Sequence, residues 1–217
     1  MPRSNTATQA IDYSTEERAR VLSFGGGPPP PPLSEPLVSN ARLGMLMLIG
    51  AETMLFTGLI GAYLVFRFGS VAWPSAQLYL PVGVTWVNTF VLLFSCYTMH
   101  RAIKAVQADN QRGLVRELSI TGLLGLTFLS VQGYEWTKLI SDGLTISTGI
   151  YGATFYTLIG CHAAHVLAAV VWLLIVVWQA RHGRFSSHSH VVVEICGMYW
   201  YYVGALWVVL FALVYLN

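Results

Sequence analysis

Residues 149–178 read GIYGATFYTLIGCHAAHVLAAVVWLLIVVW, a stretch without a single aspartate, glutamate, lysine or arginine. An α-helix rises about 1.5 Å per residue, so about 20 apolar residues cross the roughly 30 Å hydrocarbon core of a membrane. This stretch is therefore predicted to form a transmembrane helix, and it is long enough to tilt or to extend beyond the bilayer.

Four further apolar runs accompany it, at residues 43–66, 80–99, 118–139 and 191–216. Each has about the length that one membrane crossing requires. The composition agrees, because 55% of the 217 residues are hydrophobic and only 10% are charged, whereas soluble domains contain about 25% charged residues. The sequence therefore predicts an all-α, polytopic membrane protein, with a bundle of five transmembrane helices over residues 43–217.

Residues 1–42 differ in composition from the rest of the chain. They are polar and mixed in charge, and they contain three consecutive glycines at 25–27 followed by five prolines at 28–32. Polyproline is extended and has no internal hydrogen bonds. We expect a flexible, Pro-rich leader, retained in the mature chain because it lacks the apolar region of a signal peptide.

The basic residues indicate the orientation of the chain. Ten of the twelve lysines and arginines lie in the leader and in the loops after the second and fourth runs, and only Arg67 and Lys138 lie on the other side. Because cytoplasmic loops are enriched in basic residues, the N-terminus is predicted to be cytoplasmic and the C-terminus external. The formal net charge of +2 gives no reason to expect a nucleic-acid partner.

Four polar residues inside the apolar runs are the candidate functional residues: Glu52, Glu135, His162 and His165. A charge near the middle of a bilayer is costly, so Glu52 is expected to face protein or water, or to be protonated. Glu135, near the outer end of its run, is placed in the same polar interior, although it is close enough to reach the interface.

His162 and His165 are three residues apart and share a helical face. We expect an interior, hydrogen-bonded pair and no metal site, because no other run contains a histidine in its core and no Glu-x-x-His repeat occurs. The three cysteines lie in apolar runs and have neither CxxC nor zinc-site spacing.

Small residues recur at four-residue spacing in two runs, at Gly58 and Ala62, and at Gly160, Ala164 and Ala168. This spacing predicts close helix approach at those faces. The alternative is that it reflects only the abundance of glycine and alanine in membrane helices.

From Arg42 to the C-terminus, several segments resemble, in order, the motifs of subunit III of the haem-copper terminal oxidases. Residues 51–56, AETMLF, and 62–67, AYLVFR, are similar to the family pattern SExxxF…AYxxxR. Residues 127–136, TFLSVQGYEW, are similar to FLxxQxxEY. The most specific segments are SDG at 141–143, YGATFY at 151–156 and GCHAAHV at 160–166, which resemble SDG…YGSTFF…GxHxxHV.

The resemblance implies the five-helix form of a family whose larger members have seven helices. It implies a subunit without haem or copper of its own, which lies against subunit I and other oxidase subunits, where the haem and copper are expected. It further implies structural phospholipid, support of proton uptake and stability, and a bacterial-type inner (plasma) membrane location. The chain would thus be a non-catalytic subunit of an oxidoreductase of the aerobic respiratory chain.

Residues 51–52 and 132–135 favour the cytochrome c type within this family. Subunit III of a quinol oxidase and a subunit-III-like component of a nitric oxide reductase are the alternatives. Tyr201 and Gly204 stand where the family's last helix has His and Asp, so the polar network of those two residues is absent or rebuilt. A small membrane transporter, the alternative outside the family, should show inverted repeats or broken helices, and none is visible.

Five residues are candidates for contact with lipid headgroups on the cytoplasmic side: Arg42, Arg101, Arg181, His182 and Arg184. Basic residues near anionic lipid each contribute about 1 kcal/mol. Arg181 is favoured for a specific site because it stands near the position of the family's lipid-binding arginine. For most of the others we favour the interpretation that they only mark the topology.

The depths of the polar residues predict one contact. Glu52 lies about 14 Å from the inner boundary and His162 about 20 Å from the outer one, at 1.5 Å per residue. In a core of about 30 Å these heights nearly agree. We therefore expect Glu52 to face the fourth run and to hydrogen-bond His162 or His165, directly or through water or lipid. The alternative partner is a neighbouring hydroxyl, that of Thr53 or Thr57.

Overall fold

The computed structural model describes residues 39–70, 73, 82–186 and 189–216. They form five α-helices, α2 (Asn40–Gly69), α3 (Val82–Gln107), α4 (Gln111–Ser141), α5 (Ile150–Arg181) and α6 (Val191–Val214), and a 3-10 turn, η1 (Ile146–Thr148). Each predicted apolar run corresponds to one helix, which confirms the all-α prediction. Residues 1–38, which hold nearly all of the expected leader, lie outside the described residues.

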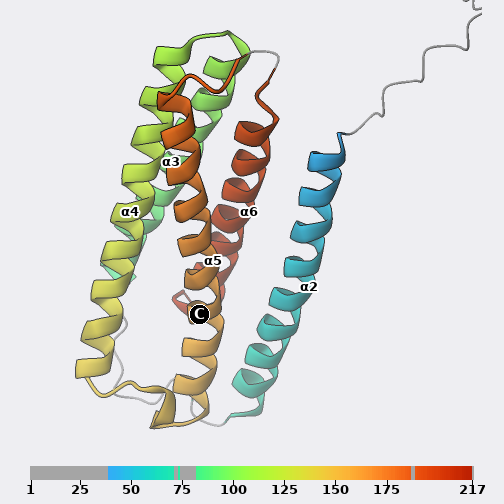
Figure 1. Ribbon diagram of the computed structural model, residues 1–217. Helices are drawn as coiled ribbons and strands as arrows, with labels where there is room; N and C mark the ends of the chain where they lie inside the picture. The colour runs from blue at the N-terminus through green and yellow to red at the C-terminus, as the bar shows by residue number, and fades with distance from the viewer. Residues whose placement is uncertain (1–38, 71–72, 74–81, 187–188, 217) are drawn as a thin grey trace, which may run out of the picture. The chain divides into compact units, whose positions relative to one another are not determined.

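Four of the helices form a closed ring in which each packs against two neighbours. α3 contacts α4 and α6, and α5 contacts the same two helices on the other side. Among the described helices, α2 packs against α5 and α6 and lies outside this ring (Figure 1). α2, α4, α5 and α6 are long and apolar enough to cross a membrane by length and composition alone.

α3 directs a row of polar residues toward the protein interior. Thr85, Asn88, Thr89, Ser95 and Thr98 are all buried, whereas the opposite face exposes large apolar side chains, among them Trp86, Phe90 and Phe94. The indole N–H groups of two buried tryptophans of α6 donate to this face, Trp200 to Ser95 at 3.1 Å and Trp207 to Thr89 at 3.0 Å. These hydroxyls reduce the hydropathy of α3 without placing polar groups on its outer surface.

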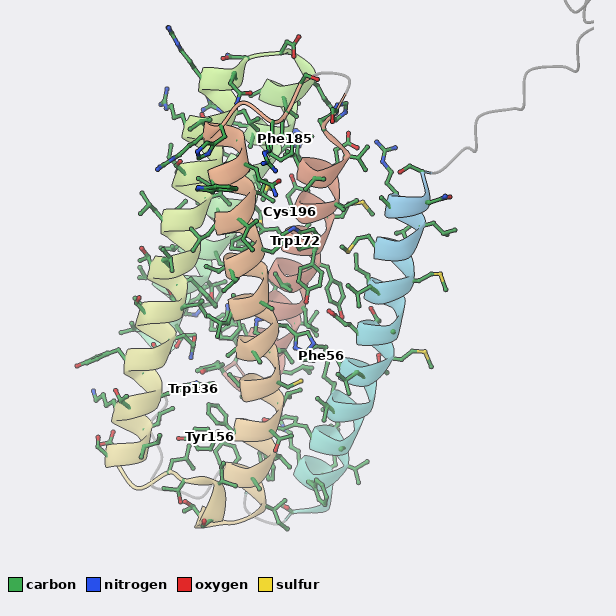
Figure 2. All side chains as sticks on the ribbon, in the orientation of Figure 1. Phe56, Trp136, Tyr156, Trp172, Phe185 and Cys196 are labelled. Atoms are coloured by element: carbon green, nitrogen blue, oxygen red, sulfur yellow. The ribbon has the colours of Figure 1, made fainter. Side chains whose placement is uncertain are left out.

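α2 is attached to the ring at both ends and at its centre. At its first turn Arg42 forms an ion pair with Glu194 of α6. At its last turn Arg67 donates to the carbonyl oxygen of Leu213 at 3.2 Å. Between them, Phe56 and Tyr63 are buried, and Figure 2 shows Phe56 between α2 and the other helices.

Close approach between elements occurs at glycines other than those that the small-residue spacing indicated. A Cβ atom on Gly125 of α4 would lie 2.6 Å from the Trp200 ring, and one on Gly152 of α5 would lie 2.2 Å from the carbonyl oxygen of Thr145. A Cβ atom on Gly58 would meet nothing within 4 Å, and Ala164 and Ala168 are exposed. The spacing therefore does not mark contacts within this chain, apart from Gly160, whose Cβ atom would lie 3.6 Å from Trp136.

Candidate functional site

Glu52 lies on the side of α2 that faces α5 and α6, one helical turn before the buried Phe56. Its side chain is 12% exposed. The Tyr199 hydroxyl of α6 donates a hydrogen bond to Oε1 at 3.1 Å, and Nε2 of His165 of α5 lies 4.0 Å from the same oxygen. Three helices therefore meet at this carboxyl group, whose other oxygen, Oε2, is buried without a hydrogen-bond partner among the described residues.

The tautomer of His165 follows from its second nitrogen. Nδ1 lies 2.7 Å from the carbonyl oxygen of Cys161, one turn earlier on α5. A carbonyl oxygen only accepts, so Nδ1 carries a proton. Nε2, which faces Glu52, is then an acceptor in the neutral ring and a donor in the imidazolium. The facing atoms are complementary either as an acid with an imidazole or as a carboxylate with an imidazolium, and both pairs are neutral overall.

His162 has a different environment, although it shares a helical face with His165. It is 1% exposed, and its ring stacks on Trp207 at a centroid distance of 5.4 Å. Neither ring nitrogen has a hydrogen-bond partner among the described residues. Phe56 contacts both imidazoles edge-on, at 6.3 Å and 5.2 Å for His162 and His165. Of the two expected partners of Glu52, His165 is therefore the one whose polar atom faces it.

The hydroxyl groups proposed as alternative partners of Glu52 are bonded elsewhere. Thr53 donates to the carbonyl oxygen of Ile49, and Thr57 donates to that of Thr53, both at 2.7 Å. Tyr199 was not predicted as the donor to Glu52. The available signal was a hydroxyl-bearing aromatic residue in the last apolar run, at a position that the family comparison had not singled out.

Glu135 lies in the interior, between α4 and α3, rather than at the interface. It is 2% exposed, and the Thr85 hydroxyl lies 3.1 Å and 3.2 Å from its two oxygens. The Gln132 amide lies 3.4 Å from Oε2 and 3.3 Å from the Tyr215 hydroxyl. The sequence motif QGYE thus brings Gln132 and Glu135, three residues apart, onto one buried helical face.

The predicted headgroup residues fall into two groups. Arg42 and Arg101 form ion pairs with acidic residues, Arg42 with Glu194 and Arg101 with Glu117 at 3.2 Å. For those on α5 and in the turn that follows it, the contacts with other described residues are neutral. The Arg181 guanidinium lies 3.5 Å from the Ser119 hydroxyl, His182 Nδ1 lies 2.8 Å from the Trp178 carbonyl oxygen, and the Arg184 guanidinium lies 5.8 Å from the centre of the Trp178 ring.

Arg181 lines a hollow of about 420 Å³ between α4 and α5. Arg112 and Arg116 of α4 line it as well, together with Gln111, Val115, Ser119, Ala180 and Gly183, and none of these residues is acidic. Arg112 and Arg116 were not predicted as headgroup candidates. Their four-residue spacing, which places both on one face of a helix, was the signal in the sequence.

Gly204, one of the two positions in the last helix where a difference from the family pattern is expected, lies close to α3. A Cβ atom on Gly204 would lie 2.9 Å from the Sγ atom of Cys96 on α3, which is closer than real side-chain contacts allow. The Tyr201 hydroxyl, at the other altered position, is buried without a hydrogen-bond partner among the described residues. The Cys96 thiol therefore occupies the space beside Gly204 at the contact between α3 and α6.

Within the described part of the chain, no three His, Cys, Asp or Glu side chains converge as metal ligands would. Several of the acids and histidines instead lie in two interior clusters, one around Glu52 and one around Glu135, and others form the ion pairs Arg42–Glu194 and Arg101–Glu117. This arrangement is typical of side chains that hold one helix against another.

Comparison with known proteins agrees with the resemblance in the sequence. Residues 34–217 match the family described as cytochrome c oxidase subunit III. A protein named cytochrome c oxidase subunit 3 from Synechocystis sp. is 37% identical over 179 residues, which cover 80% of this chain and 74% of the relative. Proteins of the same name from Thermostichus vulcanus and Corynebacterium diphtheriae are each 31% identical, over 80% of this chain and 86% of the relative.

Proposed function

The chain belongs to the cytochrome c oxidase subunit III family and is a subunit III of a haem-copper oxidase, and from this we propose that it is a non-catalytic subunit that stabilises its partner. In this proposal, haem and copper are bound by subunit I, which this chain contacts directly. The family match over the whole five-helix region carries the proposal. The chain is thus part of an oxidoreductase complex, and its own contribution is structural support and assistance to proton uptake.

Purification in mild detergent tests this function. The chain is expected to co-purify with a haem-containing subunit, and after separation it should show neither haem absorption nor oxygen reduction. Haem or copper in stoichiometric amount on the separated polypeptide would contradict the proposal. Cytochrome c is the proposed electron donor, and a preparation that oxidises quinol but not cytochrome c would place the chain in the quinol-oxidase branch.

We also propose that all five helices cross the membrane, with the N-terminus cytoplasmic and the C-terminus external, in a bacterial plasma membrane. The arrangement of α3 supports a fifth crossing, because its polar residues are buried and hydrogen-bonded while its outer face is apolar. A spanning helix must direct polar side chains inward, toward protein. Reporter fusions at residues 110 and 145 test the topology, since the proposal predicts a cytoplasmic signal at the first and an external signal at the second.

The hollow between α4 and α5 is our proposed site for the headgroup of a structural phospholipid. Arg112, Arg116 and Arg181 line it, none of its lining residues is acidic, and guanidinium groups bind phosphate by charge-assisted hydrogen bonds. Arg42 and Arg101 are less suited to this task because each already pairs with a carboxylate. His182 and Arg184, which contact Trp178, are proposed only to lie at headgroup level.

The Glu52 cluster is proposed to stabilise the packing of α2, rather than to carry out chemistry. α2 buries only Met45, Phe56 and Tyr63 among its 30 residues. Its polar contacts with α5 and α6 therefore contribute a large part of the free energy that holds it against these helices. A neutral pair between Glu52 and His165 avoids leaving one charge alone in the membrane interior. Loss of the pair should therefore loosen this subunit, or its hold on subunit I, more than it changes turnover.

A further inference from the structure

A groove of about 290 Å³ runs between α2 and α6, near the middle of α2. We call it the α2–α6 groove. Four residues of each helix line it: Thr53, Phe56, Thr57 and Ile60 of α2, and Tyr202, Ala205, Leu206 and Val209 of α6. Most of these side chains are apolar, so its three hydroxyl groups stand out at this depth in the membrane.

Two buried polar atoms at one end of the α2–α6 groove have no hydrogen-bond partner among the described residues. They are Oε2 of Glu52 and the hydroxyl oxygen of Tyr202. Tyr202 lines the groove, and the Glu52 carboxyl group, which directly precedes Thr53, is near enough to interact with it electrostatically. Because buried polar groups in native proteins pair with protein or with ordered water, both atoms require a partner.

The Thr53 hydroxyl is a third polar group at the same place. It donates to the carbonyl oxygen of Ile49 at 2.7 Å, so its oxygen remains available only as an acceptor. It lies beside the Tyr202 hydroxyl, but the two groups do not have the geometry of a hydrogen bond. One donor, one hydroxyl acceptor and one carboxyl oxygen therefore converge without satisfying one another.

We propose that the α2–α6 groove binds water, with at least one molecule bridging Glu52, Tyr202 and Thr53. A water molecule has two donors and two acceptor sites, so it can accept from the Tyr202 hydroxyl and donate to the Thr53 oxygen. Its second donor serves Oε2 of a carboxylate, and its second acceptor site serves a protonated acid. The groove is far larger than the roughly 10–15 Å³ that one water requires, and it offers the needed two to four polar partners.

Lipid satisfies this end of the α2–α6 groove less well than water does. An acyl chain can contact Phe56, Leu206 and Val209, but it has neither donor nor acceptor and would leave both buried atoms unpaired. A lipid headgroup does not reach this depth, because Thr53 lies 13 residues into α2, about 20 Å along the helix axis. Water at the polar end also leaves the apolar remainder of the groove free for an acyl chain.

Radiolytic labelling of the intact complex in nanodiscs tests the proposal, in water enriched in the heavy isotope of oxygen. X-rays convert a bound water into hydroxyl radicals, which transfer the heavy oxygen to adjacent side chains. Phe56, which is 1% exposed and lines the groove, should be labelled. Met99 is 0% exposed, and its thioether is the more reactive group, while Phe90 is 63% exposed on the outer face of α3. Both should remain unlabelled. Absence of label at Phe56, or equal label at Phe56 and Phe90, would overturn the water site.

Two variants locate the bound water. Ala205→Leu fills the α2–α6 groove, so the label at Phe56 should fall to the level of Met99. Ala168→Leu, at an exposed position of α5 outside the groove, is the matched control and should keep the wild-type label. Tyr202→Phe, which preserves the ring and removes one partner of the water, should lower the label as well. A wild-type label in both groove variants would refute the proposal. The inference does not rest on the proposed function, since every polar partner of the water belongs to this chain.

Discussion

The Nε2 atom of His165 lies 4.0 Å from Oε1 of Glu52, the oxygen to which the Tyr199 hydroxyl also donates. These residues belong to α5, α2 and α6, so one carboxyl group links the outlying helix to both of its neighbours. Because Nδ1 of His165 is bonded to the Cys161 carbonyl oxygen, the imidazole is held in the orientation that presents Nε2 to Glu52. The two residues should therefore act as a unit.

Glu52→Gln and His165→Ala are expected to be non-additive. Each change alone removes one member of the pair, so the double variant should lose less than the sum, with a coupling of about 1 kcal/mol in the free energy of unfolding. Denaturant unfolding in detergent measures it. The cycle of Glu52→Gln with the distant His182→Ala is the additive control, and a cycle with His162→Ala should show a smaller coupling. Strict additivity of Glu52 and His165 would disprove the pairing.

Tyr199→Phe isolates the hydroxyl of the third residue. The substitution keeps the ring and its contact with Trp172 at 6.0 Å, but it removes the hydrogen bond to a mostly buried carboxyl group. We expect a loss of about 1–3 kcal/mol in the free energy of unfolding. Tyr97→Phe, at a position that is 55% exposed on α3, should be close to neutral. Equal effects of the two substitutions would show that the hydroxyl of Tyr199 does not support α2.

The sequence predicted the helices more fully than it predicted their contacts. Five apolar runs predicted five helices, because the membrane admits only segments that satisfy their own backbone hydrogen bonds. The positions of Glu52 and His165 along their helices also predicted similar depths in the membrane for the two residues. Rotation about each helix axis was less accessible, so neither Tyr199 as the donor to Glu52 nor the inward polar face of α3 was identified.

Small residues were the least informative part of the sequence. Gly58 has the spacing of a helix contact but has open space at its Cβ position, whereas Gly125 and Gly152, which had no such spacing, meet neighbours at close range. Spacing reports that close approach is sterically permitted, and the rotation of the helix decides whether a neighbour is there. The hollow lined by Arg112, Arg116 and Arg181 was missed for a similar reason, since its residues come from two helices.

Removing the arginines of the hollow between α4 and α5 should release phospholipid. Arg181→Ala is expected to lower the amount of anionic phospholipid that co-purifies, and the triple variant with Arg112→Ala and Arg116→Ala should lower it further, since each basic residue contributes about 1 kcal/mol. Lipid extraction and mass spectrometry measure it. Lys104→Ala, an exposed change at the end of α3 and outside the hollow, is the control. Unchanged lipid in the Arg181→Ala complex would remove the case for a specific site.

The contact between Gly204 and Cys96 predicts that one substitution is harmful alone and tolerated in combination. Gly204→Ala places a methyl group 2.9 Å from the Cys96 sulfur, and overpacking of this kind costs about 1–3 kcal/mol. Cys96→Ala removes the sulfur, so the double variant should recover most of that loss, as measured by the midpoint of thermal unfolding in detergent.

Gly133→Ala, which adds a methyl group where nothing lies within 4 Å, should be neutral or stabilising, because alanine favours helix more than glycine does. If Gly204→Ala is as stable as the wild type, or if Cys96→Ala fails to restore stability, the sulfur is not what excludes a side chain at position 204.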